Sequence, residues 1–154
     1  WGIKCLERAI EGLKCETAVH ICYGYGIKAN TDWKLTLGNE WRQYEEVFPK
    51  LQKSNIDIIS LECHNSRVPI ELLELIRGKK VMVGAIDVAS NEIETPDEVA
   101  QTLREALKYV DADKLYPCTN CGMAPLPRHI ASAKLSALSK GAEIVRREVL
   151  GARL

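Results

Sequence analysis

Three short segments of the chain hold side chains that could bind a metal ion together. His20 and Cys22 lie two residues apart at the end of an apolar run, Glu62 ends the next run, and Cys118 and Cys121 form a C-x-x-C pair. Residues two apart on a strand share a face, so His20 and Cys22 could chelate one ion. Nitrogen, sulfur and one carboxylate oxygen suit zinc better than magnesium or calcium, which prefer oxygen donors. The pattern predicts a zinc site.

Each motif taken singly also has a structural explanation, namely a packed cysteine beside a hydrogen-bonded histidine, or a partly exposed acid at a strand end. The C-x-x-C pair could be a redox pair or half of a structural zinc site, but the chain has no second C-x-x-C pair. We therefore expect either Cys118 or Cys121 to be a ligand and the other to lie nearby. Cys63 and His64 are weaker alternatives to Glu62, because Cys63 should face the helices.

The elements that would position these side chains alternate regularly. Apolar runs typical of strands cover residues 16–23, 56–63, 81–88 and 113–118, and a stretch of helical periodicity follows each of them. The predicted helices run through Trp41 to Leu51, from Pro69 to just before Gly78, from Thr95 to about Val110, and from about Pro127 almost to the end. Thr95 to Glu98 predicts a capping box with proline at the first turn.

Alternating strands and helices predict an α/β fold with a parallel sheet. The alternatives are a doubly wound sheet and part of a (β/α)₈ barrel, of which four units make half. Polar residues gather on one face near the strand ends, as in the pairs Ser60 with Glu62 and Ala85 with Asp87. Barrel active sites are built in this way. We predict four consecutive βα units, half of a TIM (β/α)₈ barrel with parallel strands, forming one domain over residues 1–154.

The composition excludes several classes of protein. Of 154 residues 46% are hydrophobic, and 21 basic residues balance 21 acidic ones, so no surplus charge points to nucleic acid. No apolar run approaches the roughly 18 residues that span a bilayer, and no secretory signal is evident. We expect a cytoplasmic protein whose six cysteines are thiols or ligands, with Cys5 and Cys15 packed as small apolar side chains.

The chain begins inside a helical pattern, since Ile3, Leu6, Ile10 and Leu13 recur at helix spacing directly after Trp1. This start predicts a piece of a longer polypeptide, or a trimmed N-terminus. Half a barrel also leaves two unpaired strand edges and an exposed inner face. We therefore expect the chain to associate with a missing N-terminal half or with another copy of itself.

Three segments resemble the metal-binding motifs of cobalamin-independent methionine synthases, in the same order and spacing. They are His20-Ile21-Cys22-Tyr23, Ile59-Ser60-Leu61-Glu62 and Asn120-Cys121-Gly122, and the segment from Val83 to Val88 and the last helix are also similar. The resemblance covers nearly the whole chain and corresponds to the C-terminal half of the catalytic barrel. It implies that zinc is bound by four ligands: His20, Cys22, Glu62 and Cys121.

The resemblance further implies methyl transfer from 5-methyltetrahydrofolate to the thiol of homocysteine, which gives methionine, although this fragment alone would be inactive. We expect the homocysteine sulfur to displace or loosen Glu62, the hardest donor of the four. Asp87, Asn120 and Ser66 are candidates for contacts with the substrate or the metal ligands.

One position departs from the family pattern. The family typically has a histidine, read as a proton donor, two positions after the strand-end aspartate, where this chain has Ala89. The catalytic acid is therefore unknown; His64 or His129 could substitute for it. Two other functions stay open: alkyl transfer that uses another thiol, such as coenzyme M, or a methylated corrinoid donor, and a non-catalytic module stabilised by zinc.

Overall fold

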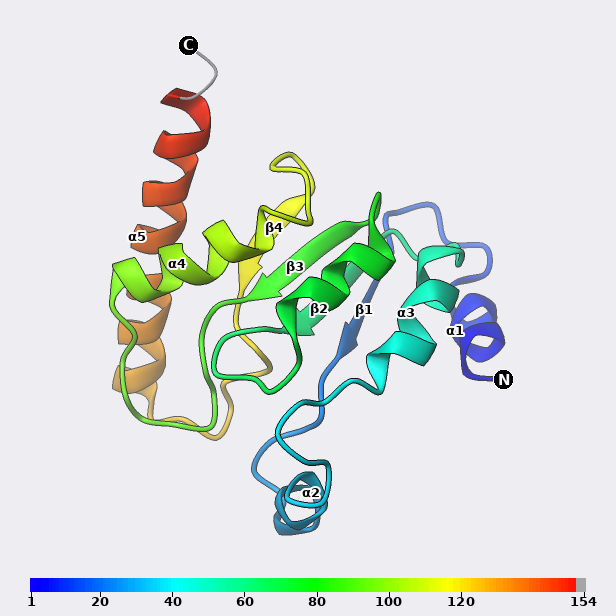
Figure 1. Ribbon diagram of the computed structural model, residues 1–154, viewed down its shortest axis with the longest axis horizontal. Helices are drawn as coiled ribbons and strands as arrows, with labels where there is room; N and C mark the ends of the chain where they lie inside the picture. The colour runs from blue at the N-terminus through cyan, green and yellow to red at the C-terminus, as the bar shows by residue number, and fades with distance from the viewer. Residues whose placement is uncertain (152–154) are drawn as a thin grey trace.

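The computed structural model describes residues 1–151 and has an α/β architecture built on a single sheet (Figure 1). In chain order its elements are α1 (Gly2–Ile10), β1 (Ala18–Ile21), α2 (Lys28–Lys34), α3 (Tyr44–Gln52), β2 (Ile58–Glu62), the 3-10 helix η1 (Ile70–Ile76), β3 (Lys80–Gly84), α4 (Pro96–Ala106), β4 (Leu115–Cys118) and α5 (Arg128–Gly151).

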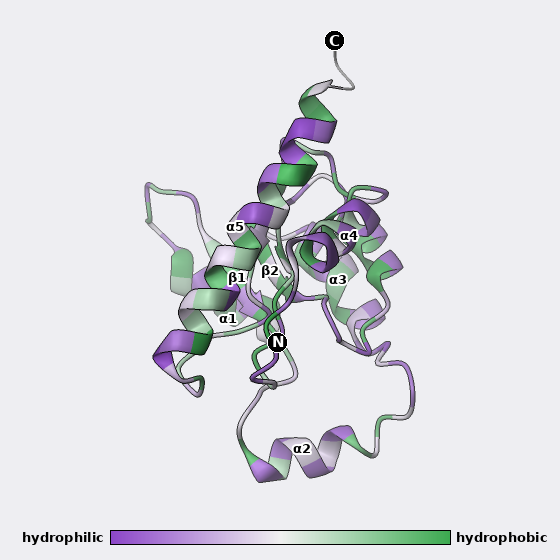
Figure 2. Ribbon diagram, turned by 90° about the vertical axis from the view of Figure 1, so that its left-hand side faces the viewer, coloured by the Kyte–Doolittle hydropathy of each residue, from purple (hydrophilic) through white to green (hydrophobic). Residues whose placement is uncertain are grey.

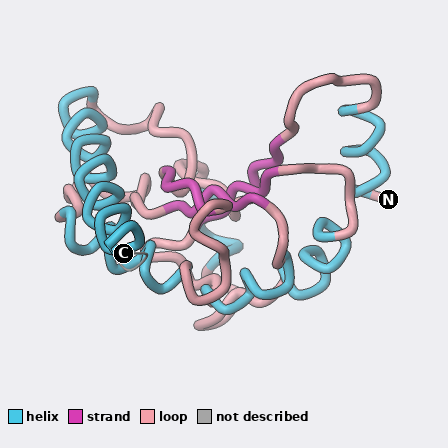
Figure 3. Tube along the Cα trace, turned by 90° about the horizontal axis from the view of Figure 1, so that it is seen from above, coloured by secondary structure: helices cyan, strands magenta, loops and turns pink. Residues whose placement is uncertain are grey.

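The four strands are parallel and lie in the order β1-β2-β3-β4. The register pairs Ala18 with Ile58 and Ile58 with Lys80, so each strand lies beside the one that follows it in the chain. Seen from above, the sheet is curved, with α3, η1, α4 and α5 on one side and its other face open (Figure 3). A doubly wound sheet would have helices on both faces and a reversal of strand order. The predicted half-barrel is confirmed.

The hydrophobic core lies between the sheet and the helices that cover it. Phe48 and Leu51 of α3, Ile76 of η1 and Leu103 of α4 are almost fully buried and pack with the sheet residues Ile59, Val81 and Val83. These apolar residues come from the inward faces of amphipathic helices, as the sequence periodicity indicates. The core therefore anchors the strand ends on which the candidate ligands lie.

Several predicted elements need correction at their ends. The strand predicted over 81–88 stops at Gly84, so Ala85 and Asp87 do not share a strand face but lie in the loop that follows. A Cβ atom at Gly84 would come within 2.5 Å of Asn120 Oδ1 and 2.6 Å of the Leu61 carbonyl oxygen. Backbone hydrogen bonds to the chain at the end of β4 continue past this point, from the Ala85 amide to the Cys118 carbonyl oxygen at 2.8 Å and from the Asn120 amide to the Ile86 carbonyl oxygen at 2.9 Å.

The helices agree more closely with expectation. The capping box is confirmed, because Thr95 Oγ1 accepts a hydrogen bond from the Glu98 amide at 3.2 Å and the Glu98 carboxylate accepts one from the Thr95 amide at 2.7 Å. The segment predicted to start at Pro69 forms a 3-10 helix. The short helix α2 was not predicted; it stands away from the rest of the molecule (Figure 2).

The prediction for Cys5 and Cys15 is wrong, since both side chains are exposed. Cys5 lies on α1, which has no buried residue, and Cys15 lies in the loop between α1 and β1. Among the described residues, no helix is both long enough and apolar enough to cross a bilayer.

Candidate metal centre

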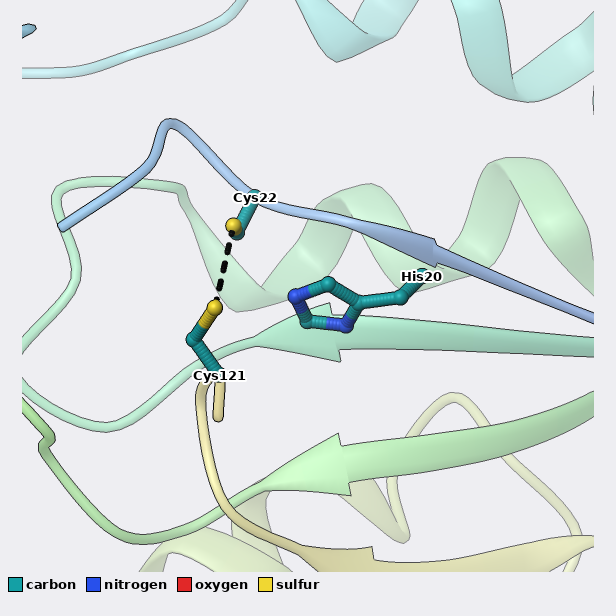
Figure 4. A group of neighbouring side chains, drawn as sticks. All are labelled: His20, Cys22 and Cys121. Atoms are coloured by element: carbon teal, nitrogen blue, oxygen red, sulfur yellow. Dashed lines mark hydrogen bonds between the residues drawn. The ribbon is translucent and has the colours of Figure 1, made fainter. Parts of the chain in front are cut away.

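Three of the predicted ligands converge at the carboxyl end of the sheet. One ligand atom from each of His20, Cys22 and Cys121 lies within 4.8 Å of the others, and the two sulfur atoms are 3.6 Å apart (Figure 4). Two sulfurs bound tetrahedrally to one zinc ion at about 2.3 Å lie about 3.8 Å from each other. The spacing and the donor types therefore fit a zinc ion.

The orientation of His20 is set by the neighbouring strand. Its Nδ1 atom forms a hydrogen bond of 3.0 Å with the hydroxyl of Ser60, which lies opposite it in the β1–β2 register. A bond at Nδ1 fixes the ring plane and leaves Nε2 as the nitrogen that would bind a metal. Ser60 is itself buried, so this contact is held by the core.

The two cysteines of the C-x-x-C pair lie in different surroundings. Cys121 belongs to the cluster, whereas Cys118, the last residue of β4, lies 4.0 Å from the Ser60 hydroxyl and is not part of it in the described chain. Burial raises the pKa of the Cys118 thiol to about 11, so this residue is a neutral packing group.

Glu62 lies beside the cluster but is not a member of it. Its carboxylate is almost fully buried, with Oε1 accepting a hydrogen bond of 2.6 Å from the Tyr23 amide and Oε2 accepting one of 2.5 Å from the Tyr25 hydroxyl. No Lys, Arg or His forms an ion pair with it within residues 1–151. A buried carboxylate without a cation is costly, and a bound metal ion would supply the missing charge.

The Cys22 thiol and the Tyr25 hydroxyl, which lie near Glu62, stay protonated when no metal is bound. Burial raises the pKa of the Cys22 thiol to about 11, with further increases from Cys121 and Glu62. Burial and the hydrogen bond to Glu62 also raise the pKa of Tyr25 well above its usual range, so its hydroxyl stays a donor. Metal binding at Cys22 must therefore displace a proton.

A hollow of about 230 Å³ opens beside Glu62. Two of the predicted substrate residues, Ser66 and Asp87, line it together with Ala89. The side chains are held by local bonds: Ser66 Oγ accepts from the Val68 amide at 3.1 Å, and Asp87 Oδ1 accepts from the Ala89 amide at 2.8 Å. A molecule in this hollow would lie beside Glu62.

The predicted residue Asn120 is placed differently. Its amide is buried and bridges two backbone groups, accepting from the Cys63 amide at 3.1 Å and donating to the His64 carbonyl oxygen at 2.6 Å. These bonds tie the loop after β4 to the end of β2, and so hold Cys121 near Glu62. A direct contact between Asn120 and substrate stays a prediction.

The two candidate replacement acids lie in different environments. His64 forms a hydrogen bond of 3.1 Å through Nδ1 with the Thr102 hydroxyl of α4, and it lines a second hollow together with Asp87 and Glu98. His129 is exposed near the start of α5. Of the two, His64 shares a lining residue, Asp87, with the hollow beside Glu62.

Sequence reasoning missed Tyr25 and Lys34, which also line the hollow beside Glu62. Lys34 Nζ lies 4.3 Å from the centre of the Tyr25 ring and donates to the Gly24 carbonyl oxygen. The available signal was the sequence Gly24-Tyr25-Gly26 directly after the His20–Cys22 pair, because two glycines permit a sharp turn.

Comparison with known proteins agrees with this architecture. Residues 8–143 match the family model described as the catalytic domain of cobalamin-independent synthases. A methionine synthase of Sulfurisphaera tokodaii is 33% identical over 150 residues, and one of Saccharolobus islandicus strain Y.G.57.14 is 32% identical over 152 residues. These alignments cover 97% of this chain but only 39% and 40% of the relatives.

A solved structure is similar over almost the entire chain. The B12-independent methionine synthase of Shewanella sp. W3-18-1, determined in complex with selenomethionine, has a TM-score of 0.94 and 83% sequence identity. The match covers 98% of this chain and 44% of that protein. The chain thus spans less than half the length of these similar proteins.

Proposed function

The chain belongs to the cobalamin-independent methionine synthase family, and from this membership we propose that it is the zinc-binding half of an enzyme that methylates homocysteine. The observation that carries the proposal is the convergence of His20, Cys22 and Cys121 within 4.8 Å, beside the buried carboxylate of Glu62. We propose these four residues as the zinc ligands. They come from the ends of β1 and β2 and from the loop after β4, where barrel enzymes place their active sites.

A bound zinc ion would hold the homocysteine sulfur as a thiolate at neutral pH, although an ordinary thiol has a pKa of about 8.5. The protein's own groups prepare the site for that step. Ser60 orients the His20 ring, and Cys22 and Cys121 lie half-buried beside it. Glu62 is the hardest donor, so we propose that it yields its place to the substrate's sulfur.

The hollow beside Glu62 is the proposed place for the rest of the amino acid. Asp87 and Ser66 line it, and an aspartate suits an α-amino group whereas a serine hydroxyl suits a carboxylate. The structural zinc alternative is less well supported, because structural sites usually have closed shells of Cys and His and no carboxylate.

The direct test is bound zinc in the complete protein, measured by atomic spectroscopy in Cys121→Ser and His20→Ala variants. We expect each variant to lose most of its zinc. Cys118→Ser is the matched control and should keep it, because Cys118 lies outside the cluster. Full zinc content in both ligand variants would contradict the site. A zinc X-ray absorption spectrum that added homocysteine leaves unchanged would favour a structural zinc.

The methyl donor is proposed to be 5-methyltetrahydrofolate, as the family resemblance implies. Ala89 lines the hollow, and its side chain has no proton to donate. This favours a second candidate methyl donor, a methylated corrinoid, because its leaving group is not a nitrogen that must be protonated. Transfer to another thiol, such as coenzyme M, would use the same metal site. Assays of the complete protein with each donor and each thiol distinguish these reactions; methionine formed from methyltetrahydrofolate would dismiss the alternatives.

The chain's partner is proposed to be the missing barrel half or a second copy. The strands β1 and β4 each have one unpaired edge within the described sheet, and the inner face is open (Figure 3). Exposed strand edges favour association with another chain or segment. Analytical ultracentrifugation of the isolated chain tests this proposal, and a stable rigid monomer would contradict it.

A further inference from the structure

The hollow beside Glu62 contains a lysine whose charge the fold does not neutralise. Lys34, the last residue of α2, is half-buried and lines this hollow of about 230 Å³. Glu62 and Asp87 line the same hollow, yet Lys34 forms no ion pair with either of them, or with any other acid within residues 1–151. Opposite charges that line one hollow without pairing suit a ligand that carries charged groups of its own.

Neutral groups hold the Lys34 ammonium group in place. It donates a hydrogen bond to the Gly24 carbonyl oxygen, and it lies 4.3 Å from the centre of the Tyr25 ring and 5.4 Å from that of the Trp41 ring. These cation–π contacts fix the position of the charge without cancelling it. Because an ammonium group has three donor hydrogens, two remain for an acceptor in the hollow.

Two other residues that line the hollow have a hydrogen-bond donor to spare. Ser66 Oγ accepts from the Val68 amide at 3.1 Å, which leaves the hydroxyl hydrogen available. Trp41 is almost fully buried, and its Nε1 atom has no hydrogen-bond partner among the described residues. An unpaired buried donor costs free energy, and an oxygen atom of a ligand would recover it. The spare donors thus favour an anionic oxygen group.

We propose that Lys34, with Ser66 and Trp41, forms the subsite for a carboxylate group of a substrate. Two molecules of the proposed reaction carry this group: homocysteine in its α-carboxylate, and 5-methyltetrahydrofolate in its glutamate tail. The inference rests on the proposed function, from which it takes these substrates. It adds the charged partner of the carboxylate, and this partner comes from α2, a helix that the alternation of strands and covering helices does not require.

The Lys34→Met variant of the complete protein tests the subsite, because it removes the charge and keeps most of the side-chain length. Calorimetry compares each substrate with an analogue that lacks the carboxylate: 3-aminopropane-1-thiol for homocysteine, and the primary amide of 5-methyltetrahydropteroic acid for the folate. A hydrogen bond to a charged group changes an equilibrium about tenfold. We expect the substrate whose carboxylate occupies the subsite to bind about tenfold more weakly, and its analogue to bind as before.

Lys28→Met is the matched control, since Lys28 lies on the same helix but is exposed and pairs with Asp32 at 2.6 Å. It should leave every affinity unchanged. Lys34→Arg keeps the charge and should retain most of the affinity. If Lys34→Met does not fold, Ser66→Ala should give a smaller loss that is selective for the same substrate.

The outcomes separate the source of the carboxylate. A loss confined to homocysteine identifies its α-carboxylate, and a loss confined to the folate identifies its glutamate tail; either result supports the subsite. No loss, or equal losses for a substrate and its carboxylate-free analogue, would overturn it, because a lysine that only stabilises the turn at Gly24 does not distinguish the two molecules. Zinc content, measured on the same wild-type sample, tests the proposed function separately, and a protein without zinc would overturn that function.

Discussion

Two glutamates are buried within residues 1–151, and they are compensated in opposite ways. Glu94, before α4, is held by Lys134 of α5, whose Nζ lies 3.0 Å from each carboxylate oxygen and whose side chain is fully buried. Glu62, at the end of β2, receives only hydrogen bonds from neutral groups in the described chain. The fold supplies a permanent counter-charge for the first carboxylate and leaves the second available to an external cation.

The difference in compensation indicates that Glu94 has a structural role and Glu62 a role in metal binding. The Lys134–Glu94 pair joins α5 to the loop after β3, and Glu94 also accepts a hydrogen bond of 2.9 Å from the Asp87 amide, which positions that loop beside the hollow. Breaking a buried pair is expensive because the remaining charge is left unpaired. Glu62 is already unpaired, so its removal should affect metal binding more than folding.

The largest effect should follow Lys134→Met, which leaves Glu94 buried without its cation. We expect the free energy of unfolding to fall by about 3–5 kcal/mol. Urea denaturation followed by circular dichroism measures this loss. The double variant Lys134→Met with Glu94→Gln should recover part of it, and an unchanged stability in Lys134→Met would show that Lys134 does not compensate the charge of Glu94.

Glu62→Gln should have a smaller effect on stability and a specific effect on metal. In zinc-free protein we expect the free energy of unfolding to change by about 1 kcal/mol or less, because the lost hydrogen-bond strength is offset by removal of a buried charge. Zinc affinity should fall at least about tenfold. If the zinc-free variant lost as much stability as Lys134→Met, the two carboxylates would not differ as described.

The smallest expected effect is on the pH dependence of the stability of the zinc-free protein. Since burial raises the pKa of the Cys22 thiol to about 11, the folded protein favours the neutral thiol. Zinc-free protein should therefore keep this contribution to stability below the ordinary thiol range and lose it as the pH rises towards 11. Zinc affinity should instead increase with pH, because binding releases the proton. Cys22→Ser should reduce the alkaline loss measured by urea denaturation at several pH values.

Much of the architecture could be predicted from sequence because it rests on periodicity. Short apolar strands alternating with amphipathic helices indicated the parallel half-barrel, and the Thr95–Glu98 pattern indicated a capping box that the structure contains. The close approach of Asn120 to Gly84 could not be predicted, since Asn120 belongs to a segment 36 positions later in the chain. Contacts of this kind leave no local pattern.

The candidate site divides in the same way. His20 and Cys22 could be selected from strand geometry, and Cys121 from the family motifs, and the structure brings the three together. The environment of Glu62 could not be predicted, because its partner Tyr25 belongs to a glycine-flanked turn without periodicity. Sequence spacing identifies donor atoms, whereas the hydrogen bonds that surround a donor depend on the folded loops.

The separation of the two ligand cysteines along the chain also has a consequence for the order of assembly. Cys22 and Cys121 are 99 residues apart, and the strands β2, β3 and β4 lie between them. A partly folded chain therefore cannot offer both sulfurs at one point. Because cross-links that close long loops remove the most chain entropy, metal capture would come last and would favour completed sheets over partial ones. Metal binding would thus stabilise only those chains whose sheet is complete.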